Sequence, residues 1–321
     1  MHSFSELVNL FENRFSASLP FPANPDSLYA PCRYFLKEGG KRIRPVICLM
    51  GNELFGEISE DAWHAAFGIE LFHNFTLIHD DIMDRAPLRR GNPTIHEKYG
   101  MTSGILCGDV MNIIAYDQIA KIEKSLQQSL QLFNKTAIEV CEGQQLDMDF
   151  ELRNDVTMDE YIHMITLKTS VLLACSLKLG AIVGGSIGDN ADKLYAFGKN
   201  MGIAFQLMDD YLDAFGDSSV TGKQNGGDIL ANKKTFLLIK ALENAKPAER
   251  TAIENLLASD SENKVPEMLS LYAATGSDKS CKNEVVRYSD NAFQCLEDVA
   301  MPSIRKEPLY ALASYLLKRE K

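Results

Sequence analysis

One pattern of carboxylates, D-D-x-x-D, occurs twice in the chain, at Asp80, Asp81 and Asp84 and again at Asp209, Asp210 and Asp213. In a helix, side chains four positions apart lie on one face, where two unpaired carboxylates repel each other. Such a set of oxygen donors suits Mg²⁺, which takes one or two carboxylates and completes its octahedron with waters and substrate phosphates. Two solvated acidic faces are the alternative, but each cluster ends an apolar helix, where the negative C-terminal dipole disfavours exposed carboxylates. We therefore expect two magnesium sites.

Cationic residues stand close to the first of these clusters in the sequence. Lys41 and Arg44 follow the glycine pair Gly39-Gly40, and Arg89-Arg90 follow Asp84 by five residues. Guanidinium groups bind phosphate oxygens bidentately, while lysine acts as a point charge. Taken singly, either run would be a solvated patch, but beside metal ligands they indicate a magnesium and phosphate site. Further donors of this kind are Lys168-Thr169, Lys223 and Lys233.

A di-iron centre is a rival interpretation. Glu70-x-x-His73 and Glu160-x-x-His163 both match the Glu-x-x-His element of di-iron helical bundles. Such a centre also requires a lone inward Glu from each of two further helices, and it leaves the aspartate clusters and the Gly-Gly-Lys run unexplained. The magnesium and phosphate interpretation therefore accounts for more of the sequence.

Composition narrows the class of protein. Among 321 residues, 45% are hydrophobic and 24% charged, as in globular proteins, and 33 Lys and Arg against 44 Asp and Glu give a net charge of −11. An acidic chain of this kind is not expected to bind nucleic acid. The seven cysteines form no C-x-x-C pair, which predicts neither zinc nor a disulfide framework.

The expected location is the cytoplasm. Glu6 and Glu12 interrupt the first apolar stretch, so we expect no signal peptide, and Lys178 interrupts the most apolar segment, 171–185, so we expect no membrane span.

Helical spacing dominates the segments that must position these residues. Apolar side chains recur at helical intervals from Trp63 to Ile82 and from Leu194 to Leu212, and no proline lies between Thr94 and Lys246. Strand alternation and Asn-Gly turns are hard to find. The sequence predicts an all-α fold of roughly ten or more helices in one domain over residues 1–321.

Taken in order, the motifs resemble those of the trans-isoprenyl diphosphate synthases, also called polyprenyl synthetases. The matching segments are Gly39-Gly40-Lys41-x-x-Arg44-Pro45, His73, Leu77 to Asp84, Arg89-Arg90-Gly91-x-Pro93-Thr94-x-His96, Gly108-Asp109, Gly143-Gln144-x-x-Asp147, Lys168-Thr169, Phe205 to Asp213, Gly222-Lys223 and Lys233-x-Thr235. They span roughly positions 39 to 240. One departure is Asn232, which stands where the family usually has Gly; Asn tolerates a left-handed backbone better than most residues.

The resemblance implies a transferase of isoprenoid biosynthesis. Its fold would be a single-domain isoprenoid-synthase-type helical bundle around a deep central cavity, assembled as a homodimer, with the two aspartate clusters facing each other across the cavity mouth. Its partners would be isopentenyl diphosphate and an allylic diphosphate, joined head to tail with the help of Mg²⁺, three ions per active site.

The same resemblance assigns roles by position. Asp80, Asp84 and Asp209 would hold magnesium, with Asp81, Asp210, Asp213 and Asp147 as possible additional ligands or supports. Arg89, Lys168, Lys223 and Lys233 would bind the allylic diphosphate, and Lys41, Arg44, His73 and Arg90 the isopentenyl diphosphate. Thr169 and Gln206 would present oxygens to the developing cation.

Product length should be set below the first cluster. At 1.5 Å rise per residue, Thr76 lies about 6 Å beneath Asp80 and Phe75 about 7.5 Å beneath it to one side, with Phe72 a turn deeper. An aromatic residue at Phe75 resembles the short-chain pattern of the family, which favours geranylgeranyl diphosphate, then farnesyl diphosphate; plain helix packing is the alternative for both phenylalanines. The alternative functions are a class I terpene cyclase and a non-catalytic subunit of a heteromeric prenyl synthase.

Overall fold

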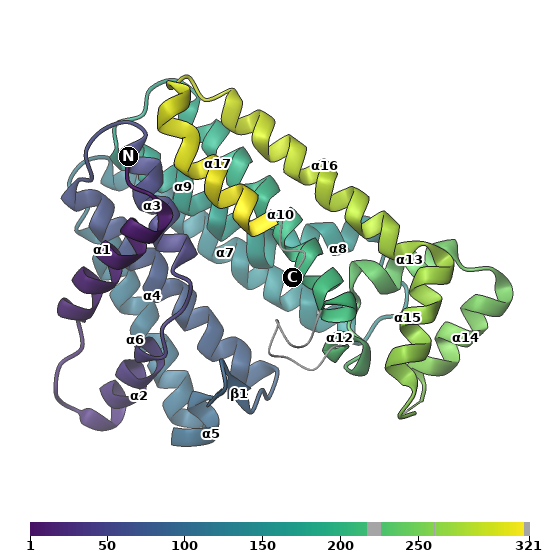
Figure 1. Cartoon of the computed structure of the whole chain (residues 1–321). Helices are drawn as coiled ribbons and strands as arrows, with labels where there is room; N and C mark the ends of the chain where they lie inside the picture. The colour runs from purple at the N-terminus through teal and green to yellow at the C-terminus, as the bar shows by residue number, and fades with distance from the viewer. Residues whose placement is uncertain (217–225, 260, 318–321) are drawn as a thin grey trace. The chain divides into compact units, whose positions relative to one another are not determined.

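The structure is a computed structural model that describes residues 1–216, 226–259 and 261–317. Helices make up nearly all of the regular structure, as the sequence predicts (Figure 1). Within the described ranges, β-structure is confined to one antiparallel hairpin, β1 (Leu88–Arg89) and β2 (Asn92–Pro93). The chain groups into two compact units, and each is built from segments that are far apart in the sequence.

The first unit comprises Met1–Lys135, Cys175–Tyr195 and Val299–Leu309. It contains the β-hairpin and the helices α1 (Phe4–Ala17), α2 (Asp26–Lys37), α3 (Ile43–Glu53), α4 (Glu60–Met83), α5 (Ile95–Tyr99) and α6 (Met101–Ala120), together with the start of α7 (Leu126–Glu151), most of α9 (Val171–Val183) and the starts of α10 (Asn190–Phe215) and α17 (Ser303–Leu317). The N-cap residue of α4 is Ser59, whose side chain accepts a hydrogen bond from the Ala62 amide at 3.2 Å.

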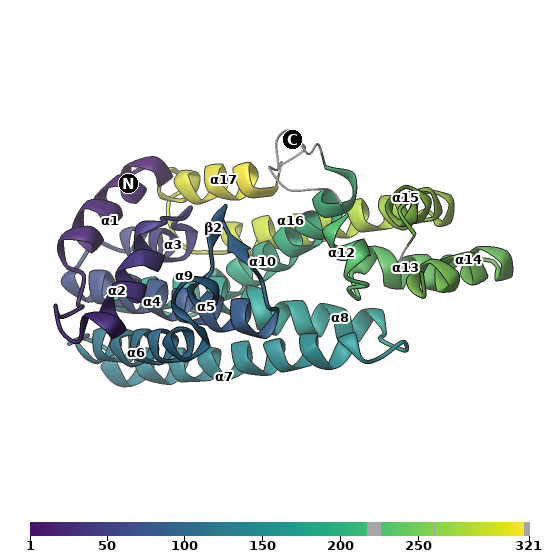
Figure 2. The ribbon, with the colours of Figure 1, turned by 90° about the horizontal axis from the view of Figure 1, so that it is seen from below.

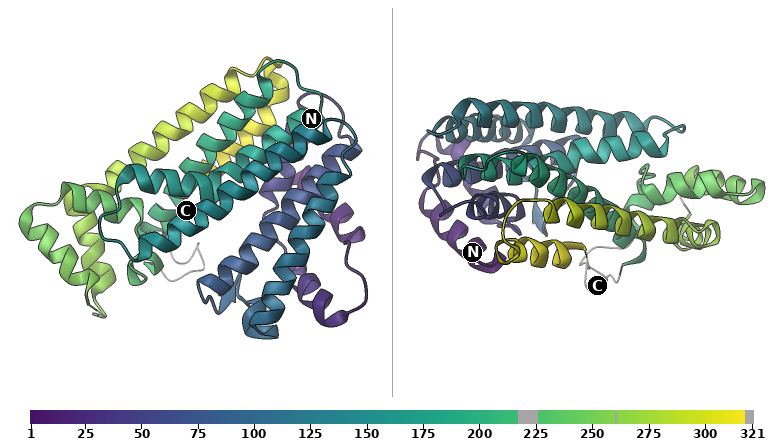
Figure 3. Two further views of the ribbon diagram at one scale, coloured as in Figure 1. Left: turned by 180° about the vertical axis from the view of Figure 1, so that it is seen from behind. Right: turned by 90° about the horizontal axis from the view of Figure 1, so that it is seen from above.

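Helices α4 and α6 pack side by side (Figures 1 and 3). Their close approach depends on small residues in α6. A Cβ atom added at Gly108 would lie 2.2 Å from His79 Nε2, and one at Gly104 would lie 2.8 Å from Ile82 Cδ1. Glycine at position 108 therefore lets the His79 ring of α4 lie directly against α6, where its Nε2 is 3.1 Å from the carbonyl oxygen of Ile105.

The second unit comprises Thr136–Ala174, Ala196–Asp298 and Tyr310 onward. Besides the remaining parts of α7, α10 and α17, it contains α8 (Met158–Ile165), the π-helix η1 (Thr166–Ser170), α12 (Gly227–Leu230), α13 (Phe236–Asn244), α14 (Pro247–Leu257), α15 (Lys264–Thr275) and α16 (Ser277–Glu297). Its core includes Tyr161 of α8 and Phe236 of α13, and α13, α14 and α15 lie together (Figure 2).

One helical run, Met158–Val183, is long and apolar enough to cross a membrane by composition, and no other in the described part of the chain is. Its most apolar window has a mean hydropathy of 1.5, and 83% of that window is buried. A buried apolar run of this kind is typical of a core helix.

Candidate active site

The first aspartate cluster lies at the C-terminal end of α4. Asp80 and Asp81 occupy its last turn and Asp84 is the C-cap residue. The three side chains differ in exposure: Asp81 is buried at 2% exposed, Asp80 is half-buried and Asp84 is exposed. Because the α4 C-terminus carries a partial negative charge, three carboxylates there require cations.

Arg89 supplies one of these cations, and it binds Asp81. From β1, its Nε lies 2.8 Å from both carboxylate oxygens of Asp81, and its Nη2 lies 2.7 Å from Asp81 Oδ1 and 3.6 Å from Asp80 Oδ2. Burial raises the pKa of Asp81, and the Arg89 guanidinium opposes that rise. The structure therefore makes Asp81 the anchor of Arg89, and it leaves Asp80 and Asp84 as the carboxylates with access to a metal.

The turn of the hairpin positions Arg89 and Arg90. Arg90 and Gly91 have φ of 53° and 81°, the two positive values that a type I′ hairpin turn requires. The sequence analysis did not find this hairpin, because arginine rarely adopts a left-handed backbone. The Gly-Gly pair of the first loop meets the turn: Arg90 Nη1 donates to the Gly39 carbonyl, and a Cβ added at Gly40 would lie 3.0 Å from Arg90 Nη2.

Arg44 and His73, both assigned by resemblance to isopentenyl diphosphate, are in contact. Arg44 Nη1 lies 3.2 Å from His73 Nε2. Burial, followed by the nearby guanidinium groups of Arg44 and Arg90, holds the pKa of His73 well below its usual value, so His73 is neutral and can accept a hydrogen bond. Burial also lowers the pKa of Arg44 to about 10.

One hydrogen-bond donor of the Arg44 guanidinium is unused among the described residues. Among the described residues, its buried Nε has no hydrogen-bond acceptor. A buried donor without an acceptor costs free energy, so an anionic ligand that accepts from this atom would be favoured. Lys41 lies in the loop just before α3, the helix that carries Arg44, and is exposed. Arg44 and His73, which the resemblance assigns to one diphosphate, are thus in contact beside an atom that suits a phosphate oxygen, and Arg90 is near enough to lower the pKa of His73. Their roles stay predictions.

An aromatic cluster surrounds the residues expected to set product length. Phe72 is 1% exposed, and its ring centroid lies 5.5 Å from that of Phe75 and 5.3 Å from that of Phe133 in α7. Phe133 in turn lies 5.1 Å from Tyr116 of α6. The Thr76 hydroxyl donates to the His73 carbonyl at 2.8 Å. Sequence reasoning missed Phe133 and Tyr116, because only the tertiary packing of three helices brings them to Phe72.

The second aspartate cluster lies on α10, in the second unit. Its middle member, Asp210, is 6% exposed and accepts hydrogen bonds from the Tyr161 hydroxyl, from Gln206 Nε2 at 3.2 Å and from the Phe236 amide at 3.2 Å. Burial raises the pKa of Asp210 to about 7, and the Tyr161 hydrogen bond opposes that rise. Asp210 therefore ties α10 to α8 and α13.

The outer members of this cluster are less buried. Asp209 and Asp213 are both half-buried. One carboxylate oxygen of Asp213 accepts from the Asp228 amide at 3.0 Å, and the Asp213 carbonyl accepts from Gly226 at 2.7 Å, so Asp213 also holds the start of α12. Asp209 remains the member of the cluster best suited to a metal.

The π-helix η1 presents the next pair of predicted residues. Thr169 Oγ1 donates to Gln206 Oε1 at 3.2 Å, so the two oxygens expected near a cation are neighbours. Lys168 Nζ binds Asp147 Oδ2 at 2.5 Å. Both contacts depend on Gly143 of α7, because a Cβ atom there would lie 2.2 Å from the Lys168 amide nitrogen. Single π-turns of this kind are frequent at functional sites.

The last motif lies between α12 and α13. Asn232 has a φ of 54°, so it adopts the left-handed backbone that its replacement of glycine requires, and the sequence analysis is confirmed there. Lys233 is exposed and its Nζ lies 3.9 Å from Asp228 Oδ1. Lys223, with Gly222, lies outside the described residues.

The donor set fits magnesium better than a metal held by protein alone. In the part of the chain that the structure describes, no three His, Cys, Asp or Glu side chains converge to hold a metal ion. The outer aspartates offer hard oxygen donors, and Mg²⁺ normally takes one or two carboxylates together with waters and phosphates. The di-iron alternative loses its ligands, because Glu70 pairs with Arg42 and Glu160 caps α8 and pairs with Arg153.

Comparison with known proteins gives a consistent result. The sequence model of the family described as polyprenyl synthetase matches residues 25–274. The geranylgeranyl diphosphate synthase of Methanosarcina mazei is 37% identical over 92% of this chain and 91% of its own length. A crystal structure of geranylgeranyl pyrophosphate synthase superimposes with a TM-score of 0.94 and 40% identity, over 100% of both chains.

A third similar protein was solved with ligands bound. The geranylgeranyl pyrophosphate synthase of Corynebacterium glutamicum, solved with isoprenyl diphosphate and magnesium, has a TM-score of 0.84 and 29% identity, over 98% of this chain and 97% of that one. The all-α isoprenoid-synthase-type fold is confirmed by these structures. The matches define a trans-prenyltransferase of the short-chain class, and a terpene cyclase or a non-catalytic subunit is not favoured. The chain belongs to the polyprenyl synthetase family.

Proposed function

We propose that the protein condenses an allylic diphosphate with isopentenyl diphosphate, head to tail, and releases geranylgeranyl diphosphate. The observation that carries this proposal is the anion site of the first unit, where buried Arg44 Nε has no acceptor among the described residues and lies beside neutral His73 and Arg90. Relatives that are named geranylgeranyl diphosphate synthases, and are 35–37% identical over most of the chain, support the product.

Magnesium, three ions per active site in this proposal, supplies Lewis-acid stabilisation of the departing diphosphate. In the first unit, Asp80 and Asp84 hold magnesium, Arg44, His73, Arg90 and Lys41 bind isopentenyl diphosphate, and Arg89 is positioned by Asp81 to bind the allylic diphosphate. In the second unit, Asp209 holds magnesium, and Lys168, Lys223 and Lys233 contribute cations. Asp147 positions Lys168 through their ion pair.

The reaction needs no enzyme nucleophile. The allylic C–O bond breaks to give diphosphate and an allylic cation, the terminal alkene carbon of isopentenyl diphosphate forms the new C–C bond, and the departing diphosphate takes the proton that is lost. Fixed donors aimed at developing charge lower such a barrier. Thr169 and Gln206, 3.2 Å apart, present oxygens to the cation, and the Gln206 amide is held in turn by Asp210.

The apolar face of α6 supports a homodimer. Ile105, Leu106 and Ile113 are 43%, 51% and 67% exposed on this helix, and an exposed apolar face of that kind marks an interaction surface. In our proposal a second copy of the chain covers it, in the cytoplasm and without a membrane span. The single polyprenyl synthetase domain over residues 1–321 stays part of the proposal.

The product assay tests this function. Purified protein with Mg²⁺, farnesyl diphosphate and isopentenyl diphosphate should release diphosphate and form geranylgeranyl diphosphate, and EDTA should abolish both. Release of neither compound with Mg²⁺ present would contradict the proposal.

Chain length is tested by Phe75→Ala. Removing this ring opens the aromatic cluster at Phe72, so the products should become longer than geranylgeranyl diphosphate when they are separated by chromatography. Phe21→Ala, which removes a ring that contacts Tyr29 near α2, is the matched control and should leave the product unchanged. An unchanged product from Phe75→Ala would show that another residue sets the length.

A further inference from the structure

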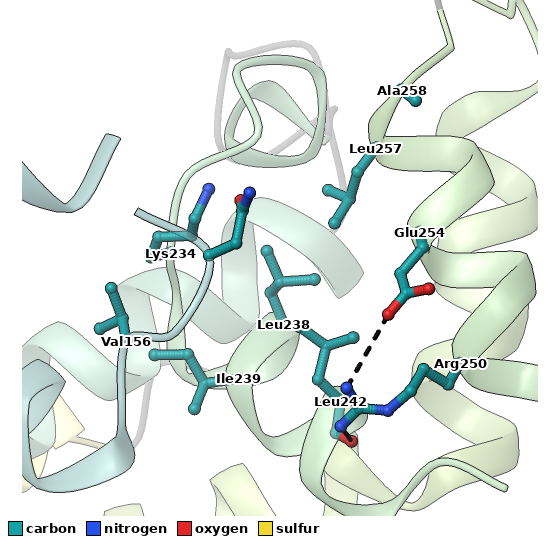
Figure 4. Close-up of a pocket in the computed structure, with 10 residues that line it drawn as sticks. Val156, Lys234, Leu238, Ile239, Leu242, Arg250, Glu254, Leu257 and Ala258 are labelled. Atoms are coloured by element: carbon teal, nitrogen blue, oxygen red, sulfur yellow. Dashed lines mark hydrogen bonds and ion pairs between the residues drawn. The ribbon is translucent and has the colours of Figure 1, made fainter. Parts of the chain in front are cut away.

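A cavity of about 420 Å³ lies in the second unit, between α13, α14 and the segment that joins α7 to α8 (Figure 4). Its volume is in the range of sites that bind small molecules. None of its lining residues has a role in the proposed reaction. The cavity is therefore a candidate for a second binding site on the enzyme.

Aliphatic side chains form about half of the cavity surface. Leu238, Ile239 and Leu242 come from successive turns of α13, Leu257 comes from the end of α14, and Val156 comes from the segment before α8. Figure 4 shows Leu238 and Leu242 between Lys234 on one side and Arg250 on the other. A hydrocarbon chain laid along these residues would remove apolar surface from water, which is favourable by about 25 cal/mol per Å².

Lys234 gives the cavity a positive charge, and the nearby Glu151 carboxylate partly offsets the effect of burial on its pKa. The Lys234 side chain is half-buried, and burial lowers its pKa. In the described residues, Lys234 forms no ion pair; its Nζ donates only to the Asn232 carbonyl, at a long 3.4 Å. A partly desolvated ammonium with one weak acceptor favours an anion beside it.

The other charged residues at the cavity already have partners. Arg250 Nη1 lies 3.8 Å from Glu254 Oε1, and Arg250 Nη2 donates to the Leu242 carbonyl at 2.9 Å. Arg250 and Glu254 therefore offset each other, and among the charged residues that line the cavity Lys234 is the one without an ion pair in the described part of the chain. The chemistry of the cavity suits a ligand with an anionic head and an apolar tail.

We propose that this cavity binds a prenyl diphosphate, with its phosphate on Lys234 and its hydrocarbon chain along Leu238 and Leu242. The identity of the ligand rests on the proposed function, since a prenyl diphosphate is the amphipathic anion that this enzyme makes. A fatty acid has similar chemistry, but its single carboxylate offers fewer acceptors to Lys234 than a diphosphate does.

The cavity is connected to the proposed reaction through Asn232. The Asn232 side-chain amide donates to the carbonyl of Leu257 at 3.1 Å, and Leu257 lines the cavity. Asn232 precedes Lys233, and a glycine at this position would have no side chain to make that bond. A ligand that contacts Lys234 and Leu257 therefore touches the residue that follows Lys233 and the residue that holds Asn232 just before it. Through these two contacts the bound product affects the position of Lys233, and with it the synthesis of more product.

Hydrogen exchange with geranylgeranyl diphosphate in EDTA tests the proposal, because chelation removes the magnesium-dependent binding of the proposed reaction. The amides of residues 234–242 and 250–258 should exchange more slowly with ligand present, and the dissociation constant follows from a titration of this protection. Lys234→Gln should weaken binding by about 10- to 100-fold, the loss expected for a hydrogen bond to a charged group. The matched control is Lys240→Gln, which removes a charge that pairs with Glu243 on the same helix and should leave binding unchanged.

The proposal is overturned if these two segments show no protection, or if wild type and Lys234→Gln bind equally well. Equal protection by inorganic diphosphate alone, or by geranylgeraniol alone, would also overturn it. Dodecanoate binding as tight as that of geranylgeranyl diphosphate would also overturn it. The product assay separates this failure from that of the proposed function, because an active synthase without protection contradicts only the cavity site. Lys234-dependent protection in an inactive protein would contradict only the synthase function.

Discussion

The two aspartate clusters have the same sequence pattern, but different groups hold their middle members. Arg89 holds Asp81 through three close contacts from a charged guanidinium. Asp210 is held by neutral donors, the Tyr161 hydroxyl, the Gln206 amide and the Phe236 amide. In both clusters the middle aspartate is buried and the outer ones are more exposed.

This difference separates what the motif determines from what its surroundings determine. The spacing places the outer aspartates about 40° apart on one helical face, and the middle one about 100° from the first and 60° from the last, toward the packed interior. The charge of the middle aspartate depends on its partner. Asp81 has a cation beside it, whereas Asp210 contacts only neutral donors among the described residues, and its pKa rises to about 7. The two clusters should therefore respond differently to substitution and to pH.

The largest expected effect comes from the outer aspartates. Asp80→Ala removes a proposed magnesium ligand, and losing several kcal/mol of transition-state stabilisation should lower kcat by about a thousandfold. Steady-state kinetics at saturating Mg²⁺ measure this change, and Asp117→Ala, an exposed residue of α6 that pairs with Lys121, is the control. Near-normal turnover by Asp80→Ala would remove the metal assignment from the first cluster.

Arg89→Gln removes the ion pair between Arg89 and Asp81 in the first cluster. Removing one partner leaves the Asp81 carboxylate buried without its cation, which should lower the free energy of unfolding by about 3 kcal/mol. Without Arg89, the folded-state pKa of Asp81 rises further above its unfolded value, so the loss should be greater at pH 8 than at pH 5. Urea unfolding at the two pH values measures both effects. Equal stability of variant and wild type would show that the ion pair contributes nothing.

Asp210→Asn tests the neutral hydrogen bonds of the second cluster through the pH dependence of the free energy of unfolding. Because the folded-state pKa is raised to about 7, the stabilising contribution is complete below the unfolded pKa near 3.8 and is lost as pH rises toward 7. Wild type should therefore lose up to about 1.4 kcal/mol per pH unit in this window relative to Asp210→Asn. Urea unfolding in EDTA measures the difference, and parallel pH profiles would mean that folding does not raise the pKa of Asp210.

The sequence predicted the α-helical class, which the structure confirms. It also assigned Arg44 and His73 to one substrate, and Thr169 and Gln206 to one role; the members of each pair are in contact, and the roles stay predictions. The helical class follows from the periodicity of the apolar residues, and the assigned roles follow from motifs of charged and polar residues. The left-handed backbone at Asn232 was predictable for the same local reason.

Tertiary packing accounts for what the sequence did not show. Arg89 reaches Asp81 through a two-residue turn in which Arg90 takes a positive φ, a choice that no local preference indicates. Gly143 is required because the backbone of η1 approaches α7 so closely that a Cβ atom at position 143 would overlap it. Phe133 contacts Phe72 from α7, which is far from α4 in the sequence. The cavity beside Lys234 likewise arises where α13 and α14 pack, with no motif to mark it.

Metal uptake by single variants tests the division of roles most directly. Manganese can replace Mg²⁺, and its binding in the presence of inorganic diphosphate can be followed by electron paramagnetic resonance for Asp80→Asn, Asp209→Asn, Asp81→Asn and Asp210→Asn, each checked for folding by circular dichroism. The outer variants should each lose bound manganese, while the folded fraction of each middle variant should bind as much as wild type. Loss of manganese from the middle variants, with retention by the outer ones, would contradict the account.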